Sequence, residues 1–476
     1  MTIALTNSYA RLPERFFVRQ NPAKPPAPAM LRLNRALARR LGLDPAALDG
    51  DAGAALFSGA ELPEGAEPLA MAYAGHQFGN WVPQLGDGRA ILLGEVVAPD
   101  GARFDIHLKG AGRTPFSRGG DGKAVLSAVL REYLVSEAMA ALGIPTTRAL
   151  AAVTTGERVM REGFERGAVL ARVAASHVRV GTFQYFYARR DSEALQALLD
   201  HVIARHYPEA AGAENPVLAL LSAVVKAQAE LVARWLSVGF IHGVMNTDNM
   251  AISGETIDYG PCAFLDSYDP NKVFSSIDRA GRYAWGRQPE IALWNLAQFA
   301  QTLVPLMGGG EEQAVAALNA RLDAFAPAFR AAHDRLFAAK IGIKEPDAES
   351  RALVADLMAL MAGESVDFTL AYSRLGRDEA GFRALFGAAP VVDWLTRWRA
   401  RRDSGWQAIM AAANPLYIPR NHRVDAALRA AEAGDMAPFD TLLEVLERPF
   451  DARAGFAEYE SPPRPEEEIH ATFCGT

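Results

Sequence analysis

The sequence has 476 residues, half of them apolar, and a chain of this size can bury a large core and form two or three lobes or domains. Its formal net charge of −7 offers no overall basic surface, which argues against a dedicated nucleic-acid binder. The only cysteines are Cys262 and Cys474, too few for a secreted disulfide framework or a cysteine zinc site.

The N-terminal residues do not have the features of a targeting segment. Its first residues, MTIALTNSYARLPERFF, lack the apolar centre of a signal peptide. We also expect no apolar run of the length that spans a membrane. A soluble, cytoplasmic protein without a membrane partner is therefore predicted.

Residues 1–69 are interpreted as an N-terminal extension. Prolines punctuate the stretch through Pro28, which predicts an extended path over the surface. Leu33, Leu37 and Leu41 then repeat at helical spacing, and Gly42 is a plausible end of that helix.

Residues 70–185 are predicted to form a β-rich lobe. The pattern indicates strands over 90–97 and 104–109, an amphipathic helix over 123–142 and a further hairpin over 153–171. Between the first hairpin and the helix, residues 110–122 contain five glycines and one proline, so they are expected to be a long mobile loop.

Residues 186–460 are predicted to form a mainly helical lobe. Apolar periodicity indicates helices over 194–206, 216–238, 291–306, 311–339 and 350–361. The tail 461–476, which carries Cys474, is rich in proline and acid and is expected to be mobile. A β-rich lobe followed by a helical one predicts an α+β, protein-kinase-like bilobal fold.

The stretch 241–260, IHGVMNTDNMAISGETIDYG, carries the strongest functional signal. Asn249 and Asp258, nine positions apart, match the way kinase-like folds hold Mg²⁺ against ATP phosphates. His242 keeps kinase spacing to Asn249, but the position of the kinase catalytic base is Val244. The motif therefore predicts binding of Mg·ATP without ordinary phosphorylation.

Basic residues upstream suit a polyphosphate. Lys109 ends a strand and Glu132 lies on the next helix, so the pair could aim one ammonium at phosphates, although an exposed ion pair is the plainer alternative. Arg172 and Arg179 could form bidentate hydrogen bonds with phosphate oxygens, or could belong to a solvated linker.

Two weaker signals complete the candidate site. Gly86, Gly88 and Arg89 form a turn that could cover phosphates with backbone N–H groups. Asp248 precedes Asn249 and could act as general base for an incoming hydroxyl, replacing the base missing at Val244. Its alternative role is to cap a loop.

With these residues assembled, the chain resembles the selenoprotein O family of protein adenylyltransferases, a pseudokinase branch. The similar blocks are LGDGRA at 85–90, LKGAGRTPFSRGGDGKA at 108–124, LREYL at 130–134, ARVAASHVRVGTFQYF at 171–186, HGVMNTDNM at 242–250 and IDYGPCAFLD at 257–266. The resemblance implies ATP bound in a flipped orientation relative to kinases, and transfer of AMP to Ser, Thr or Tyr hydroxyls of proteins.

The resemblance also implies a role for each candidate residue. Asn249 and Asp258 would bind Mg²⁺ or Mn²⁺, and Asp248 would accept the proton. Nucleotide contacts are implied for Gly86, Gly88, Arg89, Lys109, Glu132, Asp121, Gly122, Arg172, Arg179 and Asp258.

Three functions remain open on the residues alone. The first is the adenylyltransferase, and the second is a phosphotransferase that uses Asp248 as a rearranged base. The third is a non-catalytic, nucleotide-binding scaffold, although such a scaffold needs no complete metal site. As a further hypothesis, a disulfide between Cys262 and Cys474 could tether the tail over the site and act as a redox switch.

Overall fold

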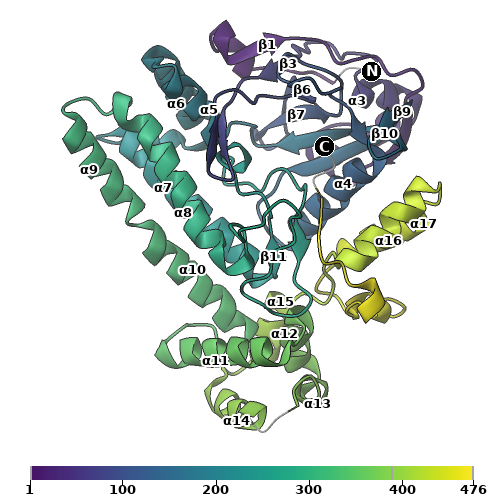
Figure 1. Ribbon diagram of the computed structural model, residues 1–476, viewed down its shortest axis with the longest axis vertical. Helices are drawn as coiled ribbons and strands as arrows, with labels where there is room; N and C mark the ends of the chain where they lie inside the picture. The colour runs from purple at the N-terminus through teal and green to yellow at the C-terminus, as the bar shows by residue number, and fades with distance from the viewer. Residues whose placement is uncertain (1–2, 388–389, 474–476) are drawn as a thin grey trace.

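A mixed α/β architecture is seen in the computed structural model, which describes residues 3–387 and 390–473. An eight-stranded antiparallel sheet lies at one end of the molecule, and most of the later helices lie away from it (Figure 1). Its strand order is β1-β3-β6-β7-β10-β9-β2, with β8 paired to β10. The strands of this sheet are β1 Phe17–Arg19, β2 Ala29–Leu33, β3 Leu69–Met71, β6 Ala90–Val97, β7 Arg103–Lys109, β8 Ala124–Val125, β9 Arg148–Met160 and β10 Phe164–Ala174.

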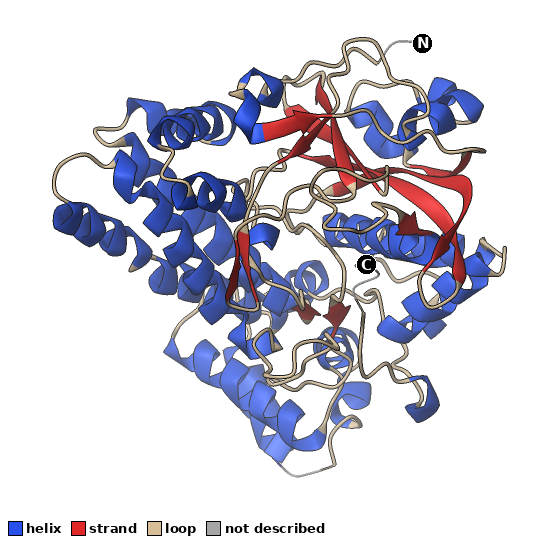
Figure 2. Cartoon of the chain, turned by 45° about the horizontal axis from the view of Figure 1, so that its top comes forward, coloured by secondary structure: helices blue, strands red, loops and turns tan. Residues whose placement is uncertain are grey.

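Two short antiparallel pairs lie outside the large sheet, and Figure 2 shows the strands among the helices. They are β4 Gly75–Gln77 with β5 Asn80–Val82, and β11 Phe240–Ile241 with β12 Ala263–Phe264. The helices up to the middle of the chain are α1 Arg35–Arg40, α2 Pro45–Leu48, α3 Asp51–Ser58, α4 Leu126–Ala141, α5 Val180–Ala188, α6 Ser192–His206 and α7 Pro216–Ser237. The later ones are α8 Gln288–Leu303, α9 Glu311–Leu322, α10 Phe325–Lys340, α11 Ala348–Glu364, α12 Phe368–Arg377, α13 Glu379–Arg383, α14 Pro390–Arg401, α15 Trp406–Ala413, α16 Asn421–Glu432 and α17 Ala437–Leu446.

The β6–β7 hairpin forms where the sequence predicts it. Seven of the eight residues of β6 are buried. Elsewhere on the sheet, α3 contacts β9 and β10, and α4 contacts the same two strands. Helices α16 and α17 then pack on α4, as Figure 1 shows at its right side. The sheet thus presents the ends of β7 and β10 to the helical region.

The N-terminal residues do not follow the extended path over the surface that was predicted for them. Phe16 is fully buried, β1 pairs with β3, and β2 pairs with β9, so this stretch supplies two strands to the large sheet. Leu33 ends β2, and the helix begins only at Arg35. The reason is that pairing at the edges of the sheet satisfies the backbone N–H and C=O groups of β1 and β2. The spacing of the leucines cannot predict such pairing with distant strands.

The helical region also departs from the predicted boundaries. The single helix predicted over 311–339 is two helices, α9 and α10, which break at Asp323 and Ala324. The short helices α12 to α17 were not predicted, because helices of about this length gain most of their stability from tertiary packing.

Helix α7 is an exception to the expectation that no segment has membrane-spanning length. It has 22 residues, and its length and apolar composition alone would allow it to cross a membrane. It packs against α8, α9 and α10, and Leu220, Val224 and Leu231 are buried in the largest apolar cluster. A core helix of a globular protein has the same composition.

The tail, expected to be mobile, makes defined contacts up to residue 473. Thr472 N donates to Phe274 O at 2.7 Å, and Ser276 N donates to Thr472 O at 3.0 Å. The Thr472 hydroxyl donates to Pro261 O at 2.6 Å. The described end of the chain is therefore attached to the segment that follows the Asp258 loop.

Candidate active site

A cavity of about 340 Å³ opens where the large sheet meets the helical region. Its walls come from the turn before β6, the ends of β7 and β10, the loop before α5 and the loops around 244–249 and 258–261. It is lined by eleven of the residues predicted from sequence: Gly86, Gly88, Arg89, Lys109, Asp121, Gly122, Arg172, Arg179, Asp248, Asn249 and Asp258. Val244, at the position of the kinase base, also lines it.

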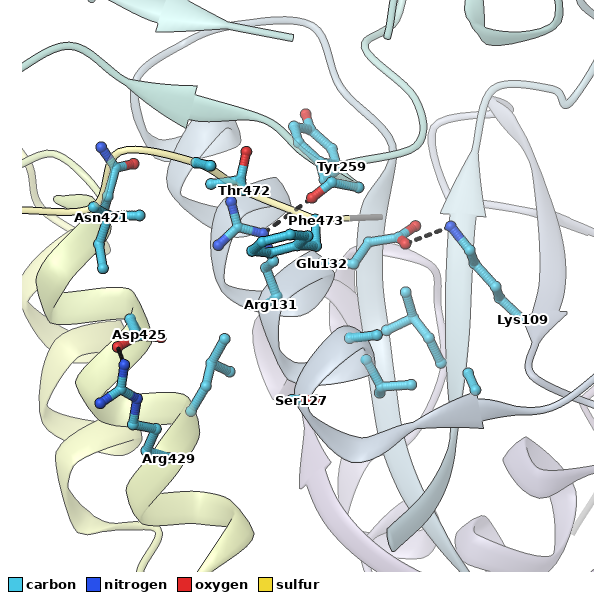
Figure 3. Close-up of a pocket in the computed structure, with 18 of the residues that line it drawn as sticks. Lys109, Ser127, Arg131, Glu132, Tyr259, Asn421, Asp425, Arg429, Thr472 and Phe473 are labelled. Carbon is cyan, nitrogen blue, oxygen red and sulfur yellow. Dashed lines mark hydrogen bonds and ion pairs between the residues drawn. The ribbon is translucent and has the colours of Figure 1, made fainter. Parts of the chain in front are cut away.

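Glu132 lies behind this cavity and lines a neighbouring one of about 390 Å³ between α4, α16 and the tail. Figure 3 shows Glu132 reaching from α4 to Lys109 on β7. Lys109 Nζ lies 2.6 Å from Glu132 Oε2 and 2.8 Å from Asp258 Oδ1. The lysine therefore bridges the helix carboxylate and the loop carboxylate at the junction of the two cavities.

Asp258 receives three cationic side chains. Besides Lys109, Arg172 Nη1 donates to Oδ1 at 2.7 Å, and Arg179 Nη1 donates to Oδ2 at 2.9 Å. Burial alone would raise the pKa of Asp258, but Lys109, Arg172 and Arg179 hold it well below its usual value. The carboxylate is thus ionised throughout the physiological range, and its φ of 64° sets it in a left-handed conformation.

Arg172 and Arg179 are almost completely buried, with 2% and 3% of their side chains exposed. Arg172 also contacts Glu132 Oε1 at 3.2 Å. Arg179 donates from the same nitrogen to Asp248 O at 2.8 Å, and its guanidinium lies 4.6 Å from the Tyr73 ring centre. Neither arginine belongs to a solvated linker, because both are fixed around Asp258.

Asp248 and Asn249 lie on one short turn, Thr247–Asn249. Asp248 is 7% exposed, and its Oδ2 accepts from Gln77 Nε2 at 3.3 Å. Within the described parts of the chain its Oδ1 is buried and accepts no hydrogen bond. Burial raises the pKa of Asp248 to about 6, against the opposing charge of Arg179. Such a carboxylate suits proton transfer near neutral pH.

The glycine turn and the loop 110–122 form the roof of the cavity. Gly86 has a φ of +79°, and a Cβ there would lie 2.4 Å from the Phe116 ring. The loop is attached to the turn by Thr114 Oγ1, which donates to Asp87 O at 2.7 Å. Asp121 forms an ion pair with Arg161 at 2.9 Å, so its carboxylate is held at the rim.

The donor set fits a divalent cation that is held partly by its nucleotide. Asn249 Nδ2 donates to Val244 O at 3.0 Å, which leaves the amide oxygen as the atom available to a metal. Among residues 3–387 and 390–473, no cluster of three His, Cys, Asp or Glu side chains could hold a metal. Mg²⁺ is commonly bound by one or two protein oxygens plus phosphates and water, so Asn249 and Asp258 could serve as its protein ligands.

Comparison with known proteins shows the family of this chain. The family model described as protein adenylyltransferase SelO matches residues 1–447. The chain belongs to this family. Similar proteins include the protein nucleotidyltransferases YdiU of Rhodopseudomonas palustris strain BisB5 and of Methylorubrum populi, each 58% identical over 484 and 490 aligned residues. YdiU of Bradyrhizobium sp. strain BTAi1 is 56% identical, and all three comparisons cover 99% of this chain and 98% of the relative.

This SelO-family cavity includes residues that the sequence reasoning missed. Tyr73 and Gln77 line it and contact Arg179 and Asp248. Asp87 lines it as well, and His107 connects Asp87 to Arg172. A signal for His107 was present, because Asp105, His107 and Lys109 alternate along a strand and therefore share one face.

Proposed function

We propose that this protein transfers AMP from ATP to serine, threonine or tyrosine hydroxyls of proteins and releases pyrophosphate. One observation carries the proposal. Lys109, Arg172 and Arg179 converge on Asp258, while the kinase-base position holds Val244 and a buried carboxylate, Asp248, lies beside the same cavity. The names of the family and of its relatives, adenylyltransferase and nucleotidyltransferase, support the same reaction.

The proposed architecture is a kinase-like bilobal one, in which residues 70–185 form the nucleotide-binding lobe and residues 186–460 the helical lobe. Residues 1–69, which supply β1 and β2 to the large sheet, would extend the first lobe, and residues 461–476 would extend the second. A cytoplasmic location is proposed with it, because ATP is the substrate. No nucleic-acid or membrane partner is proposed.

In the proposed reaction, Lys109, Arg172 and Arg179 hold the β- and γ-phosphates, so that the α-phosphorus faces the acceptor. Gly86, Gly88, Arg89, Asp121 and Gly122 would line the nucleotide, and Glu132 would orient Lys109. Asp248 takes the proton of the acceptor hydroxyl, whose oxygen bonds to the α-phosphorus as the bond to pyrophosphate breaks.

Mg²⁺ or Mn²⁺, held by Asn249 and Asp258, would neutralise phosphate charge when bound. The protein's own contribution is positional. Arg179 Nη1 contacts both Asp248 O and Asp258 Oδ2, so one guanidinium fixes the distance between the proposed base and the proposed metal ligand.

The position of the label in ATP tests the reaction. Purified protein is incubated with Mg²⁺ or Mn²⁺ and with ATP labelled on either the α- or the γ-phosphate. We expect protein to gain label from the α position only, because pyrophosphate is the leaving group. Label from the γ position would establish a phosphotransferase instead. Bound nucleotide without label from either position would favour a non-catalytic scaffold.

We also propose a redox switch between Cys262 and Cys474. Cys474 lies outside the described residues, whereas Cys262 is buried beside Arg131, whose Nη2 lies 4.0 Å from Sγ. Support comes from Thr472, whose hydroxyl donates to the carbonyl of Pro261, the residue before Cys262. Oxidation would join the two sulfurs and pass two electrons and two protons to a disulfide reagent.

Oxidised glutathione is therefore expected to produce a linked Cys262–Cys474 peptide pair and to change turnover. Dithiothreitol should reverse both effects. A Cys474→Ser variant should keep its turnover under the same treatment. Mass spectra without the linked pair, or turnover that is unaffected by oxidation, would end this proposal.

A further inference from the structure

His107 lies behind the cavity, between the glycine turn and Arg172. Its side chain is fully buried. Nε2 lies 3.1 Å from Asp87 Oδ2, and Nδ1 lies 3.1 Å from Arg172 Nη2. In the antiparallel register of β7 and β10, His107 is directly opposite Arg172, so both side chains rise from the same face of the sheet.

The partners of His107 decide which nitrogen carries its proton. A guanidinium has only N–H donors, so Nδ1 must accept from Arg172. The proton is then on Nε2, which donates to the Asp87 carboxylate. Burial and the nearby arginines lower the pKa of His107, even though Asp87 opposes them, which agrees with a neutral ring.

Asp87 is itself fixed. Its Oδ2 accepts from Met71 N at 3.0 Å, and its carbonyl accepts from Thr114 Oγ1 at 2.7 Å. It is 2% exposed, in the middle of the Gly86 to Gly88 turn. The acidic residue of the LGDGRA block, which also lines the cavity, therefore holds the imidazole through its Oδ2 atom.

We propose that His107 is a positioning residue for AMP transfer, through which Asp87 fixes the guanidinium of Arg172 against Asp258. The inference rests on the proposed function. Arg172 Nη1 is shared by Glu132 and Asp258, and Nη2 has His107 as its partner. Without an acceptor at Nη2, the guanidinium plane of Arg172 is less firmly held. Its N–H groups are then no longer fixed in the orientation that suits Asp258 and phosphate.

The test uses two replacements of His107 in the full chain. His107→Leu removes both hydrogen bonds, whereas His107→Asn can place its amide oxygen near the position of Nδ1 and accept from Arg172. We expect His107→Leu to lower kcat/KM for ATP in α-label transfer by about 10- to 100-fold, by analogy with the loss of a partner that orients a metal ligand. The affinity for Mg·ATP, measured by calorimetry, should fall as well. His107→Asn should recover part of both quantities, because it restores the acceptor for Arg172 but not the contact with Asp87.

A matched control separates positioning from general destabilisation. His206 is another histidine with a close side-chain partner, since its Nε2 lies 2.7 Å from Ser176 Oγ, but it does not line the cavity. His206→Leu should lower the melting temperature and leave ATP affinity and kcat unchanged.

A double-mutant cycle shows whether His107 acts through Arg172. Lysine at position 172 keeps the charge but lacks the fork, so His107→Leu should change kcat/KM little in an Arg172→Lys background. An equal loss in both backgrounds, or a folded His107→Leu variant with wild-type kcat/KM and affinity, would overturn the proposal. If wild-type protein transfers no label, the proposed function fails, and ATP affinity alone decides the role of His107.

Discussion

Replacing Asp258 with asparagine is expected to reduce metal-dependent AMP transfer by on the order of 10³-fold. The carboxylate is a proposed metal ligand and accepts from Lys109, Arg172 and Arg179. An amide of the same size turns an NH₂ group toward these cations and removes the charge that holds them together. The measurement is α-label transfer over a titration of Mg²⁺ and Mn²⁺.

The control for this variant is Asp278→Asn. Asp278 is also buried, but it accepts from the backbone nitrogens of Arg282 and Tyr283, at 2.9 and 2.7 Å, and does not line the cavity. The Asp278→Asn variant should be less stable than wild type, and its AMP transfer should keep the wild-type dependence on metal. Near wild-type transfer by a folded Asp258→Asn variant, with the same metal requirement, would refute the site assignment.

The second large effect is expected for Asp248→Asn. Removal of a general base costs about 10²- to 10⁴-fold in turnover, whereas ATP affinity should stay near wild type because Lys109, Arg172 and Arg179 remain. The pKa of Asp248 is raised to about 6, and a base must be ionised to accept a proton. Wild-type turnover should therefore fall as the pH drops below about 6, a limb that Asp258 cannot cause because its pKa is far lower.

The contribution of Asp248 to the stability of the fold should depend on pH in the opposite direction to turnover, so that it increases as the pH falls. The folded state holds the Asp248 proton up to about pH 6, whereas the unfolded chain releases it near the ordinary aspartate pKa of 3.8. The buried charge therefore costs stability as the pH rises through this interval, and Asp248→Asn should melt at a higher temperature than wild type at pH 8. This difference should shrink toward pH 4.

Glu255→Gln is the matched control for Asp248→Asn. Burial raises the pKa of Glu255 to about 7, yet its carboxylate accepts from Ala175 N and Ser253 Oγ, away from the cavity lining. The control should also gain stability at pH 8, but without losing turnover. An Asp248→Asn variant that transfers AMP at the wild-type rate would remove Asp248 from the mechanism.

Much of the candidate site could be predicted because its signals are local. Asn249 and Asp258 lie nine positions apart, and the β6–β7 hairpin that ends at Lys109 is set by turn chemistry and alternation. The fold was harder to predict where strands pair with partners far away in the sequence. Strands β1 and β2 join partners far along the chain, and short helices such as α12 are stabilised mainly by tertiary packing.

His107 shows why a residue can be visible in a sequence and still be missed. Its alternation with Asp105 and Lys109 indicates one face of a strand. Only the register that pairs β7 with β10 shows that Arg172 is its neighbour, and register depends on sheet packing as a whole. The tautomer of the ring follows from that neighbour.

The sequence by itself determined which chemical groups this protein carries and their spacing along the chain, including the loss of the kinase base at Val244. The tertiary structure decided what these groups do to one another. Lys109 and Asp258 are 149 positions apart in the chain, yet their charged atoms lie 2.8 Å apart. Charge, burial and hydrogen bonding act through space, so the low pKa of Asp258, the raised pKa of Asp248 and the fixed plane of Arg172 exist only in the folded chain.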